Sequence, residues 1–599
     1  MGIFQEYELL ILEIQKEIDL GAIIVSVKIK ENLKKEIVIN SVIYFLFKIN
    51  SILKGSGLRC ISKYIIVLIT IYNIKSQPAI NFRPFDWVLY KAAGSITSFT
   101  EGYTFIYIGT SKGGLKRFNL FGNYFDTPIT TAQGLESNNI TASHFDKKTG
   151  FLWVSTFDHI QYSFSREGDW FSHTLKSIGL SKFDKIYQIG STENYIWLKA
   201  RSSYVKLDHS SGIMIGIYPM PDEINIEWSS GEDYIGNNQL TNIFQNYTFL
   251  DGWILNGDEL IDRIGRSMNI TTSFIGQHGN VYIGSEDGTV FYGTKTMETF
   301  TALRPDIIND DVLSLDLKDN YLWIGSQNFL TSKGISKLDI KSLESFSYTF
   351  EETINMQPTS IYSIYDSGSE IWAGGDGAIL YFNKNKKFWK TLDESRGIPS
   401  GIIWDLCITD QHLWMGSSRG LRRLEIATQS VDQIGIEKYF DHTQIYSIEN
   451  IDNEIWIGSK SGLFIYSNNN PKLMNALNFQ KKEILSDFYN ISAIEMYGNE
   501  VFVASDMGIA KFSIHLKEWE LISSAGIYGH EMVYSMANNE KYLFLGTRKG
   551  LSRINKNSGL IRDYHFTFIG QVNDIILDDN IIWLGTINGL LRFKWKRDL

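Results

Sequence analysis

A short phrase returns along this chain about every 42 residues and constrains the fold more than any other feature. One copy reads WIGSKSGLFIY and can be aligned on its central small residue, Gly458. The aligned positions in the other copies are Gly109, Ser155, Lys199, Gly284, Gly325, Gly374, Gly416, Ala504, Gly546 and Gly585. Neighbouring copies lie 39–49 residues apart, except for one gap of 85 residues that spans two units. A period of this length indicates a repeat fold built from one supersecondary unit per copy.

Within each unit, apolar and aromatic residues alternate, and the 3.6-residue period of a helix is absent. This pattern predicts four short strands per unit, which is the size of one β-propeller blade. In the unit around Gly458 we expect an inner strand at IYSI (445–448), a second strand at EIWIGS, a corner at KSG and a third strand at LFIYS. The predicted fold class is therefore all-β, with tandem β-propellers of four-stranded blades and about twelve blades in total.

An aromatic side chain recurs two residues before the aligned position. The residues in this slot are Trp153, Trp197, Trp323, Trp372, Trp414, Trp456, Trp583, Tyr107, Tyr282, Phe502 and Phe544. Because such side chains bury roughly 150–250 Å² each, we expect them to pack blade against blade rather than to bind a ligand. The small aligned residue leaves room for a neighbouring strand, and the corner glycine permits backbone angles that a Cβ would hinder.

The pattern W-I-G-T/S-x-x-G-G-L-x-R/Y-F resembles the two-component regulator propeller repeat. That repeat forms sensor regions of bacterial hybrid two-component systems and also occurs in exported propeller proteins. The resemblance extends from about residue 85 to the end of the chain. It implies a sensor-type propeller, and members of the family usually build seven blades. The matching positions are structural, so the resemblance does not specify a ligand.

A propeller ring needs its ends joined, because an open edge strand invites aggregation. The last unit, 572–595, lacks a fourth strand, and two segments are candidates for that role: FDWVLY (85–90) and SFSYTF (345–350). If each completes the ring that follows it, propeller 1 spans 85–340 and propeller 2 spans 341–599. Each ring then has six blades. Seven plus five blades, or one large ring, are the alternatives.

One unit, at about 222–266, departs from the pattern. It keeps Trp228 and Trp253, lacks the repeated phrase and carries the stretch YIGNNQLTNIFQN. We interpret it as a blade that has drifted in sequence, in preference to an inserted binding loop.

Residues 1–80 form a separate N-terminal segment. Lys54, Arg59 and Lys63 precede the apolar run YIIVLITIYNI (64–74), and Ala79 is a candidate cleavage point. This order is typical of a secretory signal, and the run is too short to span a bilayer. We therefore predict an exported protein, periplasmic or extracellular, without a stable transmembrane anchor. The part upstream of the signal is predicted to be absent from the mature protein, and a membrane hairpin formed with VIYFLFKI (42–49) is the alternative.

Charge and cysteine content exclude several partner classes. The chain carries 57 Lys and Arg against 67 Asp and Glu, and residues beyond 80 have a net charge of −13. Nucleic acid is not expected as a partner, because phosphate contacts need clustered Lys and Arg. Cys60 and Cys407 are the two cysteines, and no Cys/His spacing typical of a metal site occurs. We predict neither a cofactor nor a metal.

In a propeller, the corners inside the repeated phrase and the loops leading into the inner strands meet at one end of the ring. Ligands are expected there, because loops on a rigid scaffold commonly carry binding residues. In the second ring the candidates are Asp376, Arg419, Asp441, His442, Lys460, Asp506, His530, Glu531 and Arg548. In the first ring they are Lys112, Asn138, Asn139, Asp310 and Asp311. Their mixed charges and amides suit a polar ligand.

No catalytic motif is present. His530-Glu531 lacks the second histidine of HExxH, and neither GxSxG nor a P-loop occurs. We therefore expect a non-catalytic double propeller that binds a polar ligand, an oligosaccharide or a peptide, or a protein partner, as a sensor or scaffold. The alternative is a propeller enzyme, a polysaccharide lyase or glycoside hydrolase, with channel-mouth carboxylates and His530 as acid and base.

Overall fold

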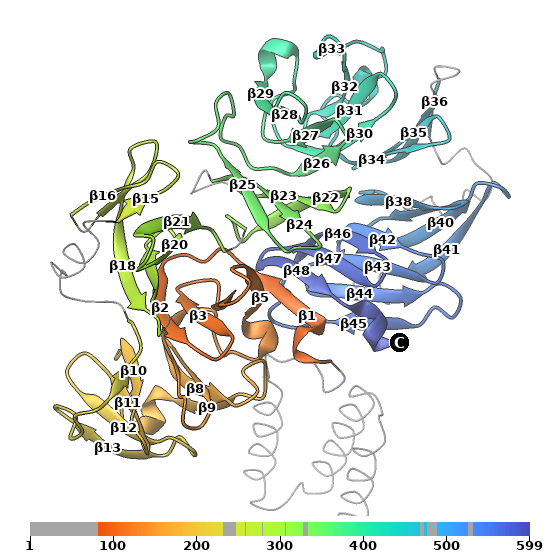
Figure 1. The fold of residues 1–599 in the computed structure, drawn as a ribbon. Coiled ribbons are helices and arrows are strands. Elements are labelled where there is room, and N and C mark those ends of the chain that lie inside the picture. Colours follow the sequence, from red (N-terminus) through yellow and green to blue (C-terminus); the bar gives the residue numbers. More distant parts are fainter. Residues whose placement is uncertain are drawn as a thin grey trace, which may run out of the picture. The chain divides into compact units, whose positions relative to one another are not determined.

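The computed structural model describes residues 82–181, 183–231, 247–257, 259–277, 279–305, 307–327, 333–467, 472–475, 488–524 and 531–599. These residues form eleven sheets and confirm the predicted all-β fold class (Figure 1). The helices in these ranges are short 3-10 turns: η1 (Pro84–Asp86), η2 (Thr131–Gln133), η3 (Leu175–Ile178), η4 (Glu394–Arg396), η5 (Glu437–Tyr439) and η8 (Trp595–Asp598). Within the described ranges, no helix has the length and apolar character needed to cross a membrane. The predicted signal segment and membrane hairpin lie outside the described residues.

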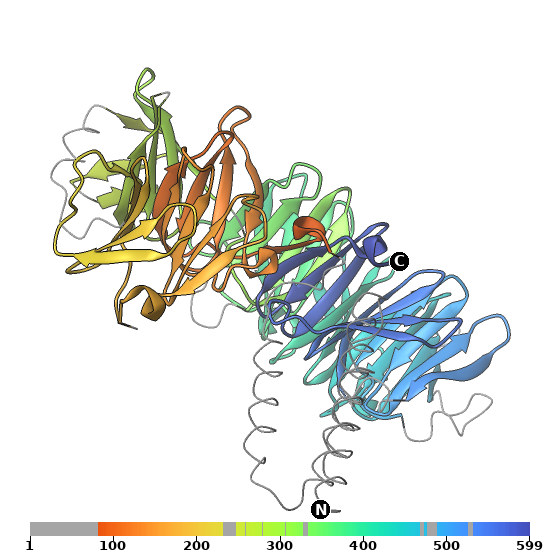
Figure 2. The ribbon, with the colours of Figure 1, turned by 90° about the horizontal axis from the view of Figure 1, so that it is seen from below.

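Seven four-stranded sheets form what we call the second ring, coloured from green to blue in Figure 2 except for one orange-red strand from the start of the described chain. Their inner strands contact one another in a closed cycle, from β22 through β26, β30, β34, β38, β42 and β46 back to β22. The first four sheets comprise β22 (Val312–Lys318), β23 (Tyr321–Ser326), β24 (Gly334–Asp339) and β25 (Ser345–Thr349); β26 (Ser363–Asp366), β27 (Glu370–Gly374), β28 (Ile379–Asn383) and β29 (Phe388–Leu392); β30 (Ile403–Ile408), β31 (His412–Ser417), β32 (Gly420–Glu425) and β33 (Ser430–Asp432); and β34 (Ile445–Ile451), β35 (Glu454–Ser459), β36 (Gly462–Ser467) and β37 (Lys472–Asn475).

The remaining three sheets of the second ring follow in chain order. They comprise β38 (Ala493–Tyr497), β39 (Glu500–Ala504), β40 (Gly508–Ser513) and β41 (Glu518–Ser524); β42 (Val533–Asn538), β43 (Tyr542–Thr547), β44 (Gly550–Asn555) and β45 (Ile561–Tyr564); and β46 (Val572–Asp578), β47 (Ile581–Thr586) and β48 (Gly589–Phe593) together with β1 (Trp87–Tyr90). The strands expected around Gly458 correspond to β34, β35 and β36, so that prediction is confirmed.

Strand β1 closes the second ring, which corrects the predicted roles of both latch segments. It pairs antiparallel with β48, with Trp87 opposite Phe593, and supplies the missing outer strand of the last sheet (Figure 1). The other candidate, β25, pairs with β24 inside its own sheet, with Tyr348 opposite Ile335. Trp87 stabilises this pairing, because its ring stacks on that of Phe593 at a centroid distance of 3.7 Å within an aromatic cluster.

The predicted division at 340/341 is therefore also wrong. The sheet from β22 to β25 contacts β26 on one side and β46 on the other, so it belongs to the second ring. The chain passes from one ring to the other between residues 303 and 312, and the second ring has seven sheets rather than six. The first ring is inserted between β1 and β22, since β1 belongs to the second ring and the other strands of that ring all follow the first ring in the chain.

The first ring comprises four sheets in the described residues, coloured from red to light green in Figure 1. Three of them are β2 (Ile96–Glu101), β3 (Phe105–Thr110), β4 (Leu115–Asn119) and β5 (Phe125–Ile129); β6 (Ile140–Phe145), β7 (Leu152–Thr156), β8 (His159–Ser163) and β9 (Phe171–Thr174); and β10 (Gln188–Ser191), β11 (Tyr195–Lys199), β12 (Tyr204–Asp208) and β13 (Met214–Tyr218). The fourth is β18 (Ser267–Ile275), β19 (Asn280–Ser285), β20 (Val290–Thr294) and β21 (Thr299–Leu303). Inner strand β2 contacts both β6 and β18.

The irregular unit at 222–266 is not a drifted blade in its described part. Its strands β14 (Glu227–Trp228), β15 (Thr248–Phe249), β16 (Ile254–Asn256) and β17 (Glu259–Ile261) join neighbouring sheets. Strand β14 pairs with the inner edge of β10, β15 pairs parallel with β21, and the hairpin β16–β17 extends β18. The stretch YIGNNQLTNIFQN lies outside the described residues.

The aromatic slot packs neighbouring sheets together, as the sequence predicts. All eleven slot residues are buried. Trp456 of β35, for example, lies 5.5 Å from Phe512 and 6.1 Å from Trp519 of the next sheet, measured between ring centroids. A Cβ on the neighbouring Gly458 would lie 2.8 Å from the side chain of Ile491, so the small residue lets the next inner strand approach.

Candidate functional site

The corners between second and third strands lie at one end of the second ring, beside the loops that lead into the inner strands. The Lys460 amide donates to the Gln444 carbonyl of its own sheet, and the Lys460 carbonyl accepts from Asn490 of the loop before the next sheet. The predicted residues on five successive corners are all exposed: Asp376, Arg419, Lys460, Asp506 and Arg548. The structure thus places these five residues at the same end of the ring, on separate sheets.

The predicted loop residues divide into exposed and structural ones. Asp441 and His442 are exposed before β34. Glu531 is buried and pairs with Lys549 at 2.8 Å and with Arg548 at 3.4 Å. The hydrogen bond from Lys549 and the two positive charges lower the pKa of the Glu531 carboxyl. This ion pair fixes a corner to the start of β42. His530 lies outside the described residues.

The residues predicted for a first-ring site do not form one. Asp310 and Asp311 precede β22 and therefore belong to the second ring, which corrects their assignment. Asp310 accepts a hydrogen bond from the Ala92 amide at 2.8 Å, next to the strand that closes that ring. Asn138 has a structural role, since its side-chain oxygen accepts from the Thr131 amide at 2.8 Å.

The other two predicted first-ring residues, Lys112 and Asn139, are exposed on a corner and on a loop of that ring. Both are polar surface residues, and the described residues around them do not form a site with them.

A set of aromatic side chains that the sequence analysis missed lies where the inner strands of the second ring begin. At the start of each inner strand, or just before it in β26 and β38, an apolar residue is followed by a variable residue and then by Ser, Asp or Ala. The variable residue is the extra one of a β-bulge in β22, β30, β34, β42 and β46, between residue pairs 312/314, 403/405, 445/447, 533/535 and 572/574. Around the ring this position holds Leu313, Tyr362, Trp404, Tyr446, Ser492, Tyr534 and Asn573. Bulges commonly redirect a side chain next to a functional site.

Three of these aromatic residues occupy successive sheets and are half-buried, whereas the apolar residues preceding them are buried. The rings of Tyr362 and Trp404 meet edge to face with centroids 5.4 Å apart. The hydroxyl of Tyr446 donates to the Gln444 side-chain oxygen at 2.5 Å. Burial raises the pKa of Tyr362, and the negative charges of Asp376 and Asp311 raise it further. We call Tyr362, Trp404, Tyr446 and Tyr534 the aromatic arc.

The first ring differs at the same position. Its bulges, between residue pairs 96/98, 140/142 and 270/272, hold Thr97, Thr141 and Thr271. These are small side chains, and Thr97 and Thr141 are buried. The remaining inner strand, β10, has the half-buried Tyr187 at this position, after the buried Ile186. The described part of the first ring thus has one aromatic side chain there, whereas the second ring has four.

The chain itself also occupies the centre of the first ring. The Ser230 hydroxyl accepts from the Phe99 amide of β2 at 2.7 Å and from Thr272 of β18 at 3.1 Å. The Ser229 hydroxyl lies 2.6 Å from Nδ1 of His144 on β6, and its carbonyl accepts from Gln188 of β10 at 2.8 Å. One short segment thus bonds to all four inner strands, and burial lowers the pKa of His144 to about 4. Because this segment fills the centre of the first ring, we look for a ligand site in the second ring.

Carboxylates line the inner strands beyond the aromatic arc. Asp405 accepts from the Ile448 amide of the next sheet at 2.7 Å, and Asp574 accepts from the Leu315 amide at 2.7 Å across the ring closure. Burial raises the pKa of Asp405 to about 7 and that of Asp574 to about 6. Glu449 of β34 and Glu495 of β38 lie two residues further along their own strands and are equivalent to each other, opposite Trp456 and Phe502. Burial raises the pKa of each to about 8, and the charge of Asp405 adds to the effect on Glu449.

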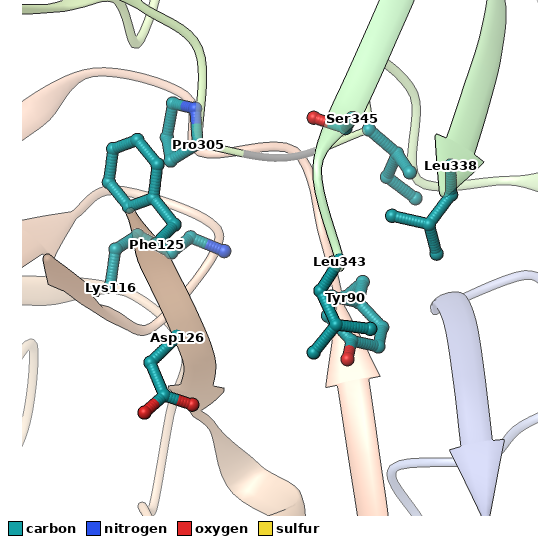
Figure 3. A pocket seen from close by; sticks show the side chains of 9 residues that line it. Tyr90, Lys116, Phe125, Asp126, Pro305, Leu338, Leu343 and Ser345 are labelled. Carbon is teal, nitrogen blue, oxygen red and sulfur yellow. The ribbon is translucent and has the colours of Figure 1, made fainter. Parts of the chain in front are cut away.

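The described residues offer no group of three or more His, Cys, Asp or Glu side chains arranged to hold a metal ion. One cavity of about 10 Å³ lies among Tyr90, Lys116, Phe125, Asp126, Pro305, Ile307, Leu338, Leu343 and Ser345 (Figure 3). It has room for about one water molecule. Its lining comes from β1, β4, β5, β24, β25 and nearby loops, so it is a packing space rather than a ligand pocket.

Comparison with known proteins does not place the chain in a family, and no family model matches it. It is 22% identical over 299 residues to Histidine kinase P4 of Formosa agariphila, which covers 44% of this chain and 21% of that protein. The chain thus spans about a fifth of the curated relative that it matches.

Similar solved structures include two extracellular domains from B. thetaiotaomicron, each named as part of a hybrid two-component system. One is 12% identical with a TM-score of 0.40, covering 83% of this chain and 70% of that one. The other is 17% identical with a TM-score of 0.38, covering 84% and 75%. The WD40 propeller domain of Doa1 is 14% identical with a TM-score of 0.36, covering 47% and 92%. Similarity at this level does not define the ligand or activity of the present chain.

Proposed function

We propose that this protein is an exported, non-catalytic binding module whose ligand site is the aromatic arc of the second ring with the polar corners around it. The ligand is a polar molecule, an oligosaccharide or a peptide, and binding is read by a protein partner in a sensor or scaffold role. The observation that carries the proposal is the arc itself, four half-buried aromatic residues at equivalent positions of one ring, three of them at β-bulges. The first ring has threonine at three of these positions, a single tyrosine, Tyr187, at the fourth, and an occupied centre.

The arrangement combines two properties that such ligands need. Aromatic faces bind the apolar side of a sugar or peptide group, while the hydroxyl and indole groups keep a polar edge available. The exposed corners Asp376, Arg419 and Lys460 then supply charged hydrogen-bonding groups on the same three sheets as Tyr362, Trp404 and Tyr446. Few polar groups placed around an apolar surface are typical of ligand sites.

The proposal is tested by a binding screen of the full chain against oligosaccharides and peptides, followed by titration calorimetry. We expect the Trp404→Ala variant to raise the dissociation constant of a hit by about 10–100-fold, since truncating a central aromatic residue often costs ~2 kcal/mol or more. Tyr446→Ala should give a smaller loss.

Phe388→Ala is the matched control, because this exposed aromatic residue lies on outer strand β29 of the sheet that carries Tyr362. Unchanged affinity in Trp404→Ala and Tyr446→Ala, with the fold intact by circular dichroism, would remove the arc as the site. Turnover of a glycan hit would favour a lyase or hydrolase instead.

A further inference from the structure

The outer surface of the first ring carries an apolar area that no other outer strand matches among the residues that the structure describes. It is centred on β13, and we define the β13 face as Phe171, Ile213, Met214, Ile215, Ile217 and Met220. Each of these residues is between 38% and 75% exposed. From 210 to 221 the sequence SSGIMIGIYPMP contains no charged residue. Exposed outer strands of the second ring do carry charges, for example Glu518 and Glu520 on β41 and Arg562 on β45.

The members of the β13 face lie together. A Cβ on Gly179, just after η3, would lie 2.7 Å from Ile217 and 3.2 Å from Met214. Phe171 stacks on Tyr162 with ring centroids 5.1 Å apart, and the Tyr162 hydroxyl donates to the Ser211 carbonyl at 2.8 Å. The face therefore extends from β9 across the β12–β13 turn onto β13, over two neighbouring sheets.

The exposed fractions amount to about three whole residues, or on the order of 500–650 Å² if a residue of this size exposes roughly 150–200 Å². This is at the upper end for the largest apolar patch of a monomer, about 300–600 Å². An ordinary interface buries about 800 Å² per partner, and in homodimers about 65% of it is apolar, which is again roughly 500 Å². The β13 face is thus as large as the apolar centre of a stable dimer.

We propose that the β13 face binds the β13 face of a second copy of this chain about a twofold axis. A contact of this kind brings the same patch of both copies together, so the patch must be complementary to itself. An uncharged apolar surface meets that condition, whereas the acidic remainder of the protein, with a net charge of −13 beyond residue 80, repels its copy. The charged residues that follow the face in the chain, Asp222 and Glu223, are already paired, since Lys206 lies 2.9 Å from Asp222 and 3.6 Å from Glu223.

The contact is made by side chains rather than by a shared sheet. The pairing between β12 and β13 shifts register at Lys206/Leu207. Lys206 pairs with Gly216 and Leu207 pairs with Met214, so Ile215 is the extra residue between them. A bulge of this kind disturbs the free edge of a strand and is one of the ways in which proteins prevent edge-to-edge pairing. It also leaves Ile215 about half exposed, at the middle of the face.

The test is sedimentation velocity of the full chain over a wide range of concentrations. We expect a dimer that dissociates on dilution. Ile215→Lys should raise its dissociation constant at least about a hundredfold, because two lysines would meet in the centre of the contact. Leu521→Lys is the matched control, since this residue is similarly exposed on outer strand β41 of the second ring, and it should leave the dimer unchanged. Ile217→Lys serves as the second variant if Ile215→Lys does not fold.

Three results would overturn the proposal. The first is a monomer at every concentration, and the second is a dimer that persists in both β13 variants or is lost equally in Leu521→Lys. The third is a monomer that floats with phosphatidylcholine vesicles through this face, which would assign the face to a lipid surface. In the dimer, amide hydrogen exchange at 213–220 should slow at high concentration in the wild type and not in Ile215→Lys.

Discussion

Replacing Trp87 with alanine is expected to lower the free energy of unfolding of the second ring by about 3–5 kcal/mol, the usual cost of removing a buried Trp side chain. Trp87 has no exposed surface and stacks on Phe593, and its ring also lies 5.8 Å from that of Tyr564 and 5.7 Å from that of Phe566. The substitution should also weaken the closure of the ring, which loss of an ordinary core residue would not do, because β1 supplies the outer strand that closes the ring. Chemical denaturation followed by tryptophan fluorescence measures the change.

Hydrogen exchange distinguishes ring closure from simple core loss. In the Trp87→Ala variant, amides of β46, β47, β48 and β22 should exchange faster, since these strands lie on either side of the closure. Trp519→Ala is the matched control, because Trp519 is also buried on an outer strand but stays within its own continuous sheet. That variant should accelerate exchange in β40 and β41 instead. Protection of β46–β48 that survives Trp87→Ala would show that β1 does not hold the ring closed.

The strands and the aromatic slot were predictable because they depend on local pattern. Successive residues in a strand point to opposite faces, so the alternation in EIWIGS predicts which side of the sheet Trp456 occupies. The small residue Gly458 is explained by one contact, the approach of Ile491 from the next sheet. These features recur in most units, so each copy supports the prediction made for the others.

The partner of the latch strand was not predictable in the same way. FDWVLY and SFSYTF are both short, alternating and aromatic, and nothing within either segment indicates which sheet will receive it. The pair Trp87 and Phe593 joins positions about 500 residues apart in the chain, and the first ring lies between them. Long-range pairing of this kind depends on the packing of the whole cluster around Trp87, which the local pattern does not contain.

A sequence signal for the aromatic arc does exist. The inner strands of the second ring include IYSI, IWDL, IYSI and VYSM, whereas the first ring has ITSF, ITAS and IYQI. The second residue is aromatic in four of the seven inner strands of the second ring and in one of the four inner strands of the first ring. The bulge that redirects this side chain is a feature of strand register. The sequence alone therefore shows that the residue differs but not where its side chain lies.

Glu449→Gln and Glu495→Gln are expected to stabilise the protein above about pH 8 and to leave its stability nearly unchanged near pH 4.5. In each case burial raises the pKa of the folded carboxyl from 4.5 to about 8. The protonated form therefore favours the folded state, and its contribution is fully present below the unfolded pKa of 4.5. It is lost as the pH rises through about 8, because ionisation then requires an unfavourable buried charge. Glutamine keeps the shape of the protonated side chain and does not ionise.

The charges around these two residues support the sign of the effect. Glu449 faces Asp405 of β30, and Glu495 faces Glu449 of β34 and Asp574 of β46, all of them acidic. Cys407 of β30 lies near Glu449, and burial raises the pKa of its thiol as well. Lys556 is the one cation that acts on Glu495 among the described residues, and it lowers the pKa of that carboxyl. It also lies 3.3 Å from Glu500, which shares its charge.

Urea denaturation at a series of pH values between 4.5 and 9 measures the effect. Each variant should lose less stability than the wild type across this range, with a gain of about 1–3 kcal/mol at the alkaline end, since one pKa unit corresponds to ~1.4 kcal/mol and partial solvent access reduces the full shift. Glu518→Gln, at an exposed position of β41, is the matched control and should follow the wild type. A variant that is less stable than the wild type at pH 9 would mean that the ionised carboxylate has a favourable partner at the centre of the second ring. The acidic inner strands would then be a binding surface, extending the site beyond the aromatic arc.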